Sequence, residues 1–279
     1  MSMGPILVNS LEQLARRKLV VAAGIISVLF LGLYALFCSL VTSQSEGSAI
    51  PGPDAALAAI FLTLPAAASL CAAFLFILGS SLLPEEISAG RAGFWAALPV
   101  SRRSLFSGFT LSCLFVCCAL SAFLFGGIEG IAAAFFPNTP TNVLLAVLSF
   151  FAWAAVLWAA VTLLSMLLNR IVAIIICFCA YGLMNFLGGL SQLAGAIPEG
   201  GPGEAFRTAG LVSALLMPSD PPFRMMLYGL MPKGAMMEEM MAFTGATAQP
   251  PLVLTLYALV WSLGVMLVAY WKFSRQDLK

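Results

Sequence analysis

The sequence contains no histidine and few charged side chains. Of its 279 residues, 13 are Lys or Arg and 12 are Asp or Glu, so 9% are charged, against about 25% in a typical soluble domain. Histidine is the commonest general base and metal ligand near neutral pH, so its absence removes the usual forms of both chemistries. A net charge of +1 provides no basic surface for nucleic acid. The composition therefore excludes a soluble enzyme and a nucleic-acid-binding protein.

Three catalytic motifs are also missing from the sequence. The chain has no G-x-x-x-x-G-K-[ST] loop for ATP, no H-E-x-x-H zinc motif and no G-x-S-x-G nucleophile turn. We therefore expect no resident cofactor or metal and no enzymatic activity of the chain by itself.

Long stretches without charge are the main feature that is present. Apolar residues make up 61% of the chain, and a helix needs about 20 of them to cross a bilayer. Barrel strands are shorter and alternate in polarity, so these stretches predict helices. The first one is too long for the core of a cleaved signal peptide. The sequence predicts an all-α membrane protein with six transmembrane helices, at 19–41, 55–83, 105–128, 143–168, 171–194 and 252–271.

Two features refine this map. Pro65 lies inside the second stretch and predicts a kink, because neighbouring helices can satisfy the carbonyl that proline leaves free. Only Asn169 and Arg170 separate the fourth and fifth stretches, so we expect a tight hairpin there.

Basic side chains indicate the orientation. The outer segments 42–54 and 129–142 contain none, and segment 195–250 contains three, Arg207, Arg224 and Lys233. The other ten fall on the opposite side: Arg16, Arg17, Lys18, Arg91, Arg102, Arg103, Arg170, Lys272, Arg275 and Lys279. Cytoplasmic loops carry the excess of Lys and Arg, so both termini are predicted to be cytoplasmic.

Residues 4–18 predict an amphipathic helix before the first span. Leu7, Leu11 and Leu14 share one face, and charged side chains lie elsewhere on the helix. Such a helix lies in the membrane interface; the alternative is an ordinary solvated lead-in.

Segment 84–104 is the largest predicted cytoplasmic loop. Phe94, Trp95 and Leu98 are three or four residues apart and therefore share a helical face. Pro99 ends that helix, because proline disfavours the α conformation of the preceding residue. An aromatic face in the cytosol is typical of a protein contact. The alternative is that the aromatic side chains rest on the bilayer interface, where Trp is common.

Segment 195–250 is predicted to form short helices between Gly/Pro turns at 198–203 and 218–222. It contains a methionine cluster: Met217, Met225, Met226, Met231, Met236, Met237, Met240 and Met241. Thioether sulfur binds copper(I), which makes Met236, Met237, Met240 and Met241 candidate ligands. The absence of a Met-rich repeat favours an adaptable apolar surface on the outer leaflet instead.

The polar side chains inside the six stretches are uncharged hydroxyl and amide groups. We expect them to form helix–helix hydrogen bonds: Thr63, Ser69, Ser112, Thr162, Asn185 and Gln192. The seven cysteines all lie in these stretches without a C-x-x-C pair, so they are expected to pack as small apolar side chains.

No Asp or Glu lies in a predicted span, whereas ion-coupled carriers place ionisable groups near the midplane. Transport against a gradient would need energy from a second protein.

The six-span layout and the loop resemble the permease subunit of type-2, exporter-type ATP-binding-cassette (ABC) transporters. That family's loop reads as an acidic pair, small residues, Gly, an apolar anchor, Pro-Val/Ile-Ser/Thr-Arg and a later Gly. The matching residues here are Glu85-Glu86, Gly90, Trp95-Ala96-Ala97-Leu98, Pro99-Val100-Ser101-Arg102 and Gly108. Phe109 departs from the Lys or Arg that the family often has. The tail 273–278 is similar to the family's basic-Asp-Leu ending, and Met217-Pro218-Ser219-Asp220 with Arg224 is similar to the outer segment of copper-enzyme maturation permeases.

The resemblance implies a multi-pass protein of a prokaryotic cytoplasmic membrane. Two permease chains, identical or different, would form the membrane unit, and two copies of a P-loop ATPase subunit would bind ATP and Mg beneath it. Residues 4–18 would be the elbow helix, and short re-entrant helices before the last span would gate the exit. The loop 84–104 would be the coupling element, with contact residues Glu85, Glu86, Gly90, Arg91, Phe94, Trp95, Leu98, Pro99 and Arg102.

Three other functions stay open on the sequence. A self-contained channel or secondary carrier would normally show a midplane charge. An intramembrane enzyme would need a catalytic constellation, and only Arg170 and hydroxyl groups lie near the membrane. A non-transporting assembly factor needs neither. A P-loop ATPase encoded in the adjacent reading frame would separate the exporter from all three.

Overall fold

The computed structural model describes residues 3–45, 52–81, 101–135, 142–193, 202–230 and 251–275. Within these ranges the chain forms nine α-helices and no strand, so the all-α prediction is confirmed there. The segments 82–100 and 231–250 lie outside the described residues. They contain most of the predicted coupling loop and the candidate copper ligands.

Six of the helices are long: α2 (Lys18–Ser45), α3 (Gly52–Gly79), α6 (Arg102–Phe135), α7 (Val143–Leu167), α8 (Arg170–Leu193) and α12 (Leu252–Arg275). All but α3 have the length and composition of a membrane span, and each coincides with a predicted stretch. Helix α3 continues through Pro65, and its described apolar part covers Thr63–Gly79. A multi-pass membrane protein is therefore supported by five helices, and the count of six stays a prediction.

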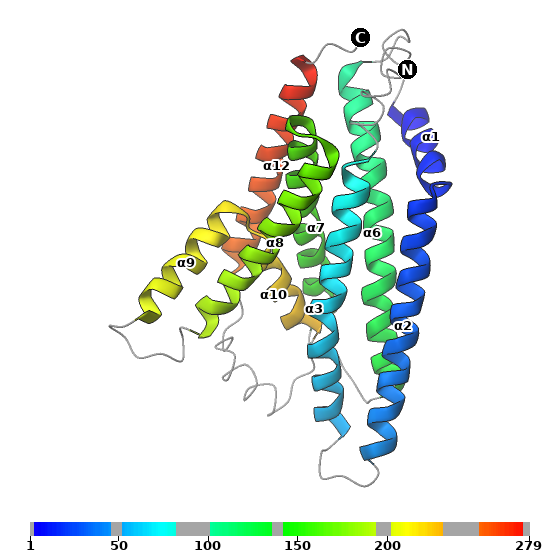
Figure 1. Ribbon diagram of the computed structural model, residues 1–279, viewed down its shortest axis with the longest axis vertical. Helices are drawn as coiled ribbons and strands as arrows, with labels where there is room; N and C mark the ends of the chain where they lie inside the picture. The colour runs from blue at the N-terminus through cyan, green and yellow to red at the C-terminus, as the bar shows by residue number, and fades with distance from the viewer. Residues whose placement is uncertain are drawn as a thin grey trace.

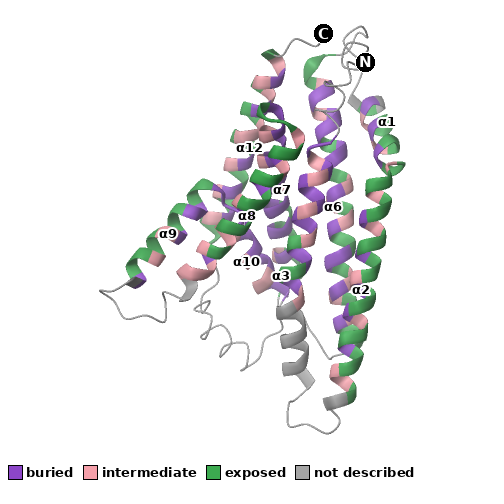
Figure 2. Ribbon diagram, in the orientation of Figure 1, coloured by how far each residue is buried: buried purple, intermediate pink, exposed green. Residues whose placement is uncertain are grey.

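Helix α7 is the centre of the bundle. It packs against α3, α8, α10 and α12, and 61% of its most apolar stretch is buried, against 22% for α2, α8 and α12. Buried residues (purple in Figure 2) follow α7, whereas the outer helices α2 and α8 show long exposed faces. The exposed faces consist of large aliphatic side chains such as Leu33, Ile171 and Val260. Such faces are suited to contact with lipid.

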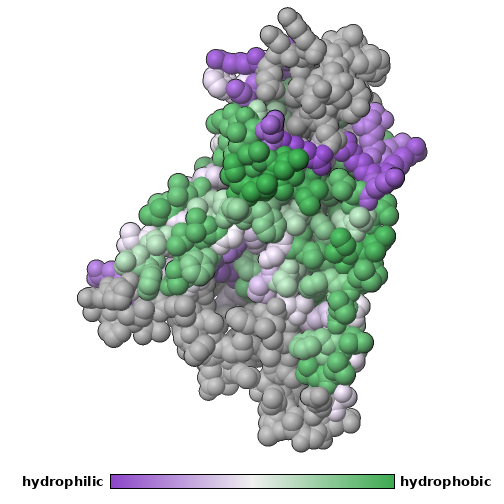
Figure 3. Space-filling model, in the orientation of Figure 1, coloured by the Kyte–Doolittle hydropathy of each residue, from purple (hydrophilic) through white to green (hydrophobic). Residues whose placement is uncertain are grey.

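Helix α1 (Met3–Ala15) and the C-terminal end of α12 lie at the same end of the bundle (Figure 1). Hydrophilic side chains gather at this end, whereas hydrophobic side chains cover the middle of the visible face (Figure 3). Helix α3 runs back towards this end after α2 has left it (Figure 1). The helices at the two ends of the described chain therefore lie at the same end of the bundle (Figure 1).

The N-terminal helix is present, but its buried face differs from the prediction. Ile6, Ser10 and Leu14 are buried, whereas Leu7 and Leu11 are half-buried. The buried face packs against α6 in a second core with Leu105, Phe106, Phe109, Cys113, Met166, Ala269 and Phe273. The helix is therefore docked on the bundle rather than only resting on lipid. Phe109, which departs from the family pattern, is apolar because it is part of this core.

Replacing Gly108 by Leu is expected to release α1 from α6. A Cβ atom at Gly108 would lie 2.8 Å from Ile6 Cγ2 and 3.3 Å from Ile6 Cβ, so a larger side chain cannot fit beneath α1. Overpacking of this kind typically costs about 1–3 kcal/mol. Faster amide hydrogen exchange across residues 3–15 would report the release. Gly126→Leu is the control, because nothing lies within 4 Å of a Cβ there, and equal exchange in both variants would contradict the close packing.

Helix α6 is longer than predicted. It continues to Phe135, so the predicted outer segment 129–142 begins as helix, and Glu129, which follows the predicted span 105–128, is part of this long helix. The residues Gly130–Phe135 are small or apolar and extend the helix. At about 1.5 Å per residue, Glu129 lies roughly 16 Å from the middle of α6. That position is near the edge of a hydrocarbon core about 30 Å thick, not at its midplane.

The orientation can be tested at Ser104. In a cysteine-free background, single cysteines at Ser48, Ser104 and Thr247 are expected to differ in reaction with a membrane-impermeant maleimide on intact cells. Positions 48 and 247 should react, because they lie in segments predicted to be outside. Position 104 should stay unlabelled until the membrane is opened, since it follows Arg102 and Arg103 at the predicted inner end of α6. Labelling of position 104 on intact cells would reverse the map.

Candidate functional site

The predicted coupling loop is described only where it joins α6. Glu85, Glu86, Gly90, Arg91, Phe94, Trp95, Leu98 and Pro99 lie outside the described residues. Arg102 is described, and its Nη1 donates a hydrogen bond to the carbonyl oxygen of Ser274 at 2.7 Å. Arg103 Nε donates to the hydroxyl of Tyr270 at 3.3 Å. The start of α6 is thus fastened to the end of α12.

The end of α3, which precedes the same loop, is hydrogen-bonded to α8. Arg170 is the first residue of α8, and its Nη2 donates to the carbonyl oxygen of Ile77 at 3.4 Å. Helix α7 ends at Leu167, and α8 begins three residues later, which confirms the predicted break at Asn169 and Arg170. The two helices on either side of the loop, α3 and α6, are therefore each bonded to another helix through an arginine.

Away from this end, two short helices form a hairpin in the predicted outer segment. Helix α9 (Pro202–Leu216) packs against α8, and α10 (Asp220–Leu230) packs against α7. In Figure 1, α9 runs towards the middle of the bundle, and α10 runs back from the turn at 217–219. The predicted turn at 218–222 ends three residues earlier, at Ser219, because Pro221 and Pro222 lie in the first turn of α10, where a missing N–H costs nothing.

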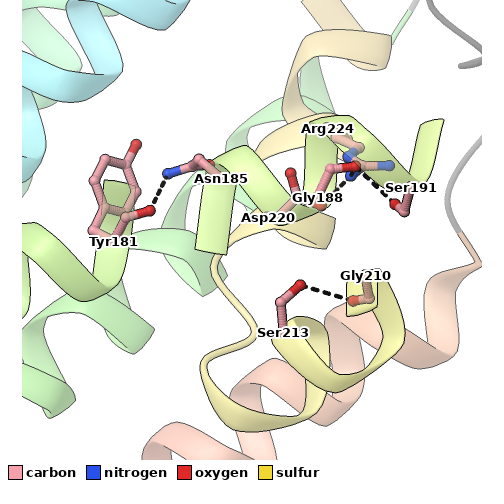
Figure 4. Close-up of polar contacts among 8 residues, drawn as sticks. All are labelled: Tyr181, Asn185, Gly188, Ser191, Gly210, Ser213, Asp220 and Arg224. Carbon is pink, nitrogen blue, oxygen red and sulfur yellow. Dashed lines mark hydrogen bonds and ion pairs between the residues drawn. The ribbon is translucent and has the colours of Figure 1, made fainter. Parts of the chain in front are cut away.

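An ion pair fixes the start of α10 against α8 (Figure 4). Arg224 Nη2 lies 2.5 Å from Asp220 Oδ2 and donates a hydrogen bond to the carbonyl oxygen of Gly188 at 2.6 Å. Ser191 Oγ donates to the same carbonyl oxygen at 2.7 Å. Burial raises the pKa of Asp220, and Arg224 acts in the opposite direction. Burial therefore disfavours the charged form of Asp220, and Arg224 offsets part of that cost.

Three glycines allow the hairpin to approach its neighbours. A Cβ atom at Gly188 would lie 2.6–2.8 Å from the carboxyl atoms of Asp220. At Gly210 it would collide with the side chain of Ser191, and at Gly229 it would lie 2.8 Å from the carbonyl oxygen of Asn142. The N–H of Asn142 donates to the Gly229 carbonyl oxygen at 2.9 Å. Both ends of α10 therefore pack closely against a neighbouring segment, Asp220 against Gly188 and Gly229 against Asn142.

An aromatic cluster lies beneath α10. Trp153 on α7 has no exposed surface, and its ring lies 6.3 Å from Phe223 of α10 and 6.4 Å from Tyr181 of α8, measured between centroids. The indole of Trp153 interacts with the hydroxyl of Tyr181, whereas the hydroxyl of the buried Ser219 has no hydrogen-bond partner among the described residues. A buried hydroxyl without a partner is unusual in a folded protein.

The described methionines correct one prediction. Met217 and Met226 are buried in the core that includes α7, and Met225 is also buried, so these three do not form a surface on the outer leaflet. The candidate copper ligands Met236, Met237, Met240 and Met241 lie outside the described residues. Within the described ranges, no group of three His, Cys, Asp or Glu side chains could hold a metal ion.

If the methionine cluster binds copper(I), changing Met236, Met237, Met240 and Met241 together to Leu is expected to abolish stoichiometric binding. Leu keeps the apolar volume and removes the thioether sulfur that a soft ion prefers. Competition with a copper(I) chelator measures the binding. Unchanged binding, or none by the parent protein, would remove copper from consideration.

Three of the six polar side chains expected to form helix–helix bonds instead bond within their own helix. Ser69, Thr162 and Asn185 donate to carbonyl oxygens four residues earlier, which contradicts the expected helix–helix bonds. Ser112 does form one, to the carbonyl oxygen of Leu7 at 3.2 Å. The seven cysteines are free thiols, and five are buried. A short hydroxyl or amide reaches its own helix more easily than a neighbour, which explains the difference.

The sequence contained one signal for this site. Asp220 and Arg224 are four residues apart at the start of a helix, a spacing that favours an ion pair. Their contact with Gly188 joins positions distant in the sequence and had no local signal.

No family model matches the chain, and no curated protein is significantly similar to it.

Proposed function

We propose that this chain is the membrane-spanning permease subunit of an exporter-type ABC transporter in a prokaryotic cytoplasmic membrane. Two copies of a P-loop ATPase subunit would bind ATP and Mg and dock on the loop 84–104. A second permease chain, identical or different, would complete the membrane unit. The proposal names coupling residues on the loop, of which Arg102 contacts the end of α12.

The observation that carries the proposal is the position of α8. Its first residue, Arg170, contacts the end of α3 beside the loop, and Gly188 contacts the ion pair of α10. These residues are 18 positions apart, or about 27 Å along a helix. A single rigid helix thus links the proposed ATPase-facing end to the hairpin near the opposite side.

This link provides a route for coupling. A push on the loop would move the end of α3, and Arg170 would transfer that movement to α8. Gly188 would then shift relative to Asp220 and Arg224, and α10 would follow. Arg102 would move α12 in parallel, because it bonds to Ser274. Packed helices respond by small discrete shifts rather than continuous bending, so the hairpin would alternate between two positions.

A self-contained carrier is the second candidate, and Glu129 is the observation that favours it. Glu129 lies on α6, and its Oε1 is buried and has no hydrogen-bond partner among the described residues. Ionisable groups inside membrane helices are functional by default. A proton-coupled carrier would lose uptake or efflux when Glu129 becomes Gln, whereas an ATP-driven exporter would keep most of its activity.

The test is co-purification with the product of the neighbouring gene. Solubilised protein is expected to retain a P-loop ATPase in equal numbers of the two subunits, and ATP hydrolysis should rise when both are placed in nanodiscs together. Uncoupled hydrolysis by the ATPase alone is the baseline. If no ATPase is retained and a proton gradient alone drives transport, the carrier is correct and the exporter is not.

A further inference from the structure

The end of α12 presents one large aromatic side chain to the outside of the bundle. Phe273 is buried, and its ring lies 5.5 Å from that of Phe106 on α6, measured between centroids. Ala269, one turn earlier, is buried as well. These contacts fix the rotation of the helix end, and Trp271, on another face, is 53% exposed. Tryptophan is common where a membrane helix reaches the lipid headgroups, so Trp271 marks that level here.

Arg275 lies one turn beyond Trp271 on the same face. Its Cζ atom is 4.0 Å from the centre of the Trp271 ring, and the residue is exposed. No carboxylate among the described residues pairs with it. A guanidinium has five N–H donors in one plane. Contact with an aromatic ring leaves donors for a phosphate group, which arginine can bind through two parallel hydrogen bonds.

Cations outnumber carboxylates at this end of the bundle. Lys272 and Arg275 lie in the last turn of α12, and Arg102 and Arg103 of α6 are hydrogen-bonded to the same end of that helix. In the part of the chain that the structure describes, the carboxylate at this end is Glu12 of α1, which lies 4.0 Å from an arginine of its own segment. The surplus of positive charge complements an anion.

An apolar row leads from Trp271 towards the middle of the helix. Val260, Leu263 and Leu267 are each about two-thirds exposed. They are three or four residues apart and therefore share the face of Trp271. From Val260 to Trp271 the helix rises by roughly 16 Å, close to half of a hydrocarbon core about 30 Å thick. The row thus has the depth of one leaflet, and a soluble anion would leave it uncovered.

We infer that the end of α12 is a binding site for an anionic phospholipid. The phosphate bonds to Arg275 beside Trp271, and the acyl chains lie on the row of Val260, Leu263 and Leu267. A zwitterionic lipid has the same phosphate, but the surrounding cations repel its positive headgroup, so the site selects an anionic one. The inference requires only that α12 spans a membrane, and it does not rest on the proposed exporter function.

The test uses the full chain in detergent, with dioleoylphosphatidylglycerol and dioleoylphosphatidylcholine as probes. Native mass spectrometry counts the bound lipids at each concentration and gives the affinity of the first one. We expect the anionic lipid to bind about tenfold more tightly. Arg275→Gln should reduce this preference to less than twofold. Arg275→Lys should keep part of it, because lysine retains the charge but not the two parallel bonds.

Lys18→Gln is the matched control for these variants. Lys18 is an exposed cation at the same end of the bundle, at the start of α2. Its loss should leave the preference for the anionic lipid within about twofold of the parent value. An equal loss in Lys18→Gln and Arg275→Gln would mean that the lipid responds to the overall charge of this end. That result would overturn the site.

Tryptophan fluorescence in nanodiscs tests the position of the lipid. Phosphatidylglycerol with brominated acyl chains is expected to quench more strongly than brominated phosphatidylcholine at the same mole fraction, because it gathers beside an exposed tryptophan. Trp271→Phe should remove this excess quenching while keeping an aromatic ring. Trp153→Phe is the control, since Trp153 has no exposed surface, and it should leave the excess unchanged.

Other occupants of this surface give different results. Equal affinity of the two lipids would make the surface part of an ordinary lipid annulus and overturn the inference. Loss of the excess quenching on addition of inorganic phosphate would assign Arg275 to a soluble anion. A disulfide-linked dimer of Leu263→Cys in a cysteine-free background would show that a second copy of the chain covers the row. Either of these two results also overturns the lipid site.

Discussion

Replacing Trp95 by Ala is expected to weaken the association with the ATPase subunit by more than about tenfold. Truncation of a buried aromatic anchor at a protein interface typically costs about 2 kcal/mol or more, and about 1.4 kcal/mol already corresponds to a factor of ten. Trp95 lies between Pro84 and Pro99 on the loop, beside Phe94 on the face predicted to enter the partner. The measurement is co-purification of the ATPase, together with its stimulated hydrolysis of ATP.

Arg103→Ala is the matched control for that variant. Arg103 lies at the start of α6, and its exposed side chain bonds to Tyr270. An exposed charge at an interface rim contributes little to affinity, so association should fall by less than about threefold. Neither position lies in the middle of a membrane helix, and both variants should insert and fold. Unchanged association in Trp95→Ala would mean that Trp95 rests on the bilayer interface.

The helical bundle was predictable because charge marks the ends of membrane helices. The stretches 143–168 and 171–194 match α7 and α8 to within one residue at each end, since Asn142, Asn169 and Arg170 interrupt the apolar pattern. Asn142 also caps α7, because its Oδ1 accepts the N–H of Leu145 at 3.1 Å. The rule failed at Glu129, where one carboxylate occurs in a helix that continues to Phe135. A single charge near the membrane edge does not end a helix whose next residues still favour it.

The hairpin site was only partly predictable, for a different reason. Local spacing indicates the ion pair of Asp220 and Arg224, and Gly/Pro turns indicate two short helices. The docking of α10 on Gly188 depends on which helix face meets which neighbour, and composition does not record this. Gly188 and Gly189 are adjacent in the sequence, yet only Gly188 has a neighbour within 4 Å of a Cβ atom. Tertiary packing alone distinguishes the two.

The difference between Gly188 and Gly189 provides a test of how α10 packs against α8. Gly188→Ala is expected to destabilise the protein by about 1–3 kcal/mol, because its Cβ would overlap the carboxyl group of Asp220. Gly189→Ala should be neutral or stabilising by up to about 1 kcal/mol, since alanine favours helix and the space beside Gly189 is open. Thermal unfolding in detergent measures the first effect, and hydrogen exchange across residues 202–230 shows whether the loss is confined to the hairpin.

A second substitution decides whether the loss arises at the ion pair. Asp220→Ala removes the carboxyl group that the new methyl would strike, so the double variant Gly188→Ala with Asp220→Ala should be more stable than the sum of the two single effects predicts. Residues in direct contact commonly show interaction energies of about 0.5–3 kcal/mol in such a cycle. Additive effects would mean that α10 does not rest on Gly188 in the membrane. In that case α8 could not transmit movement from Arg170 to the hairpin, and the proposed coupling route would fail with it.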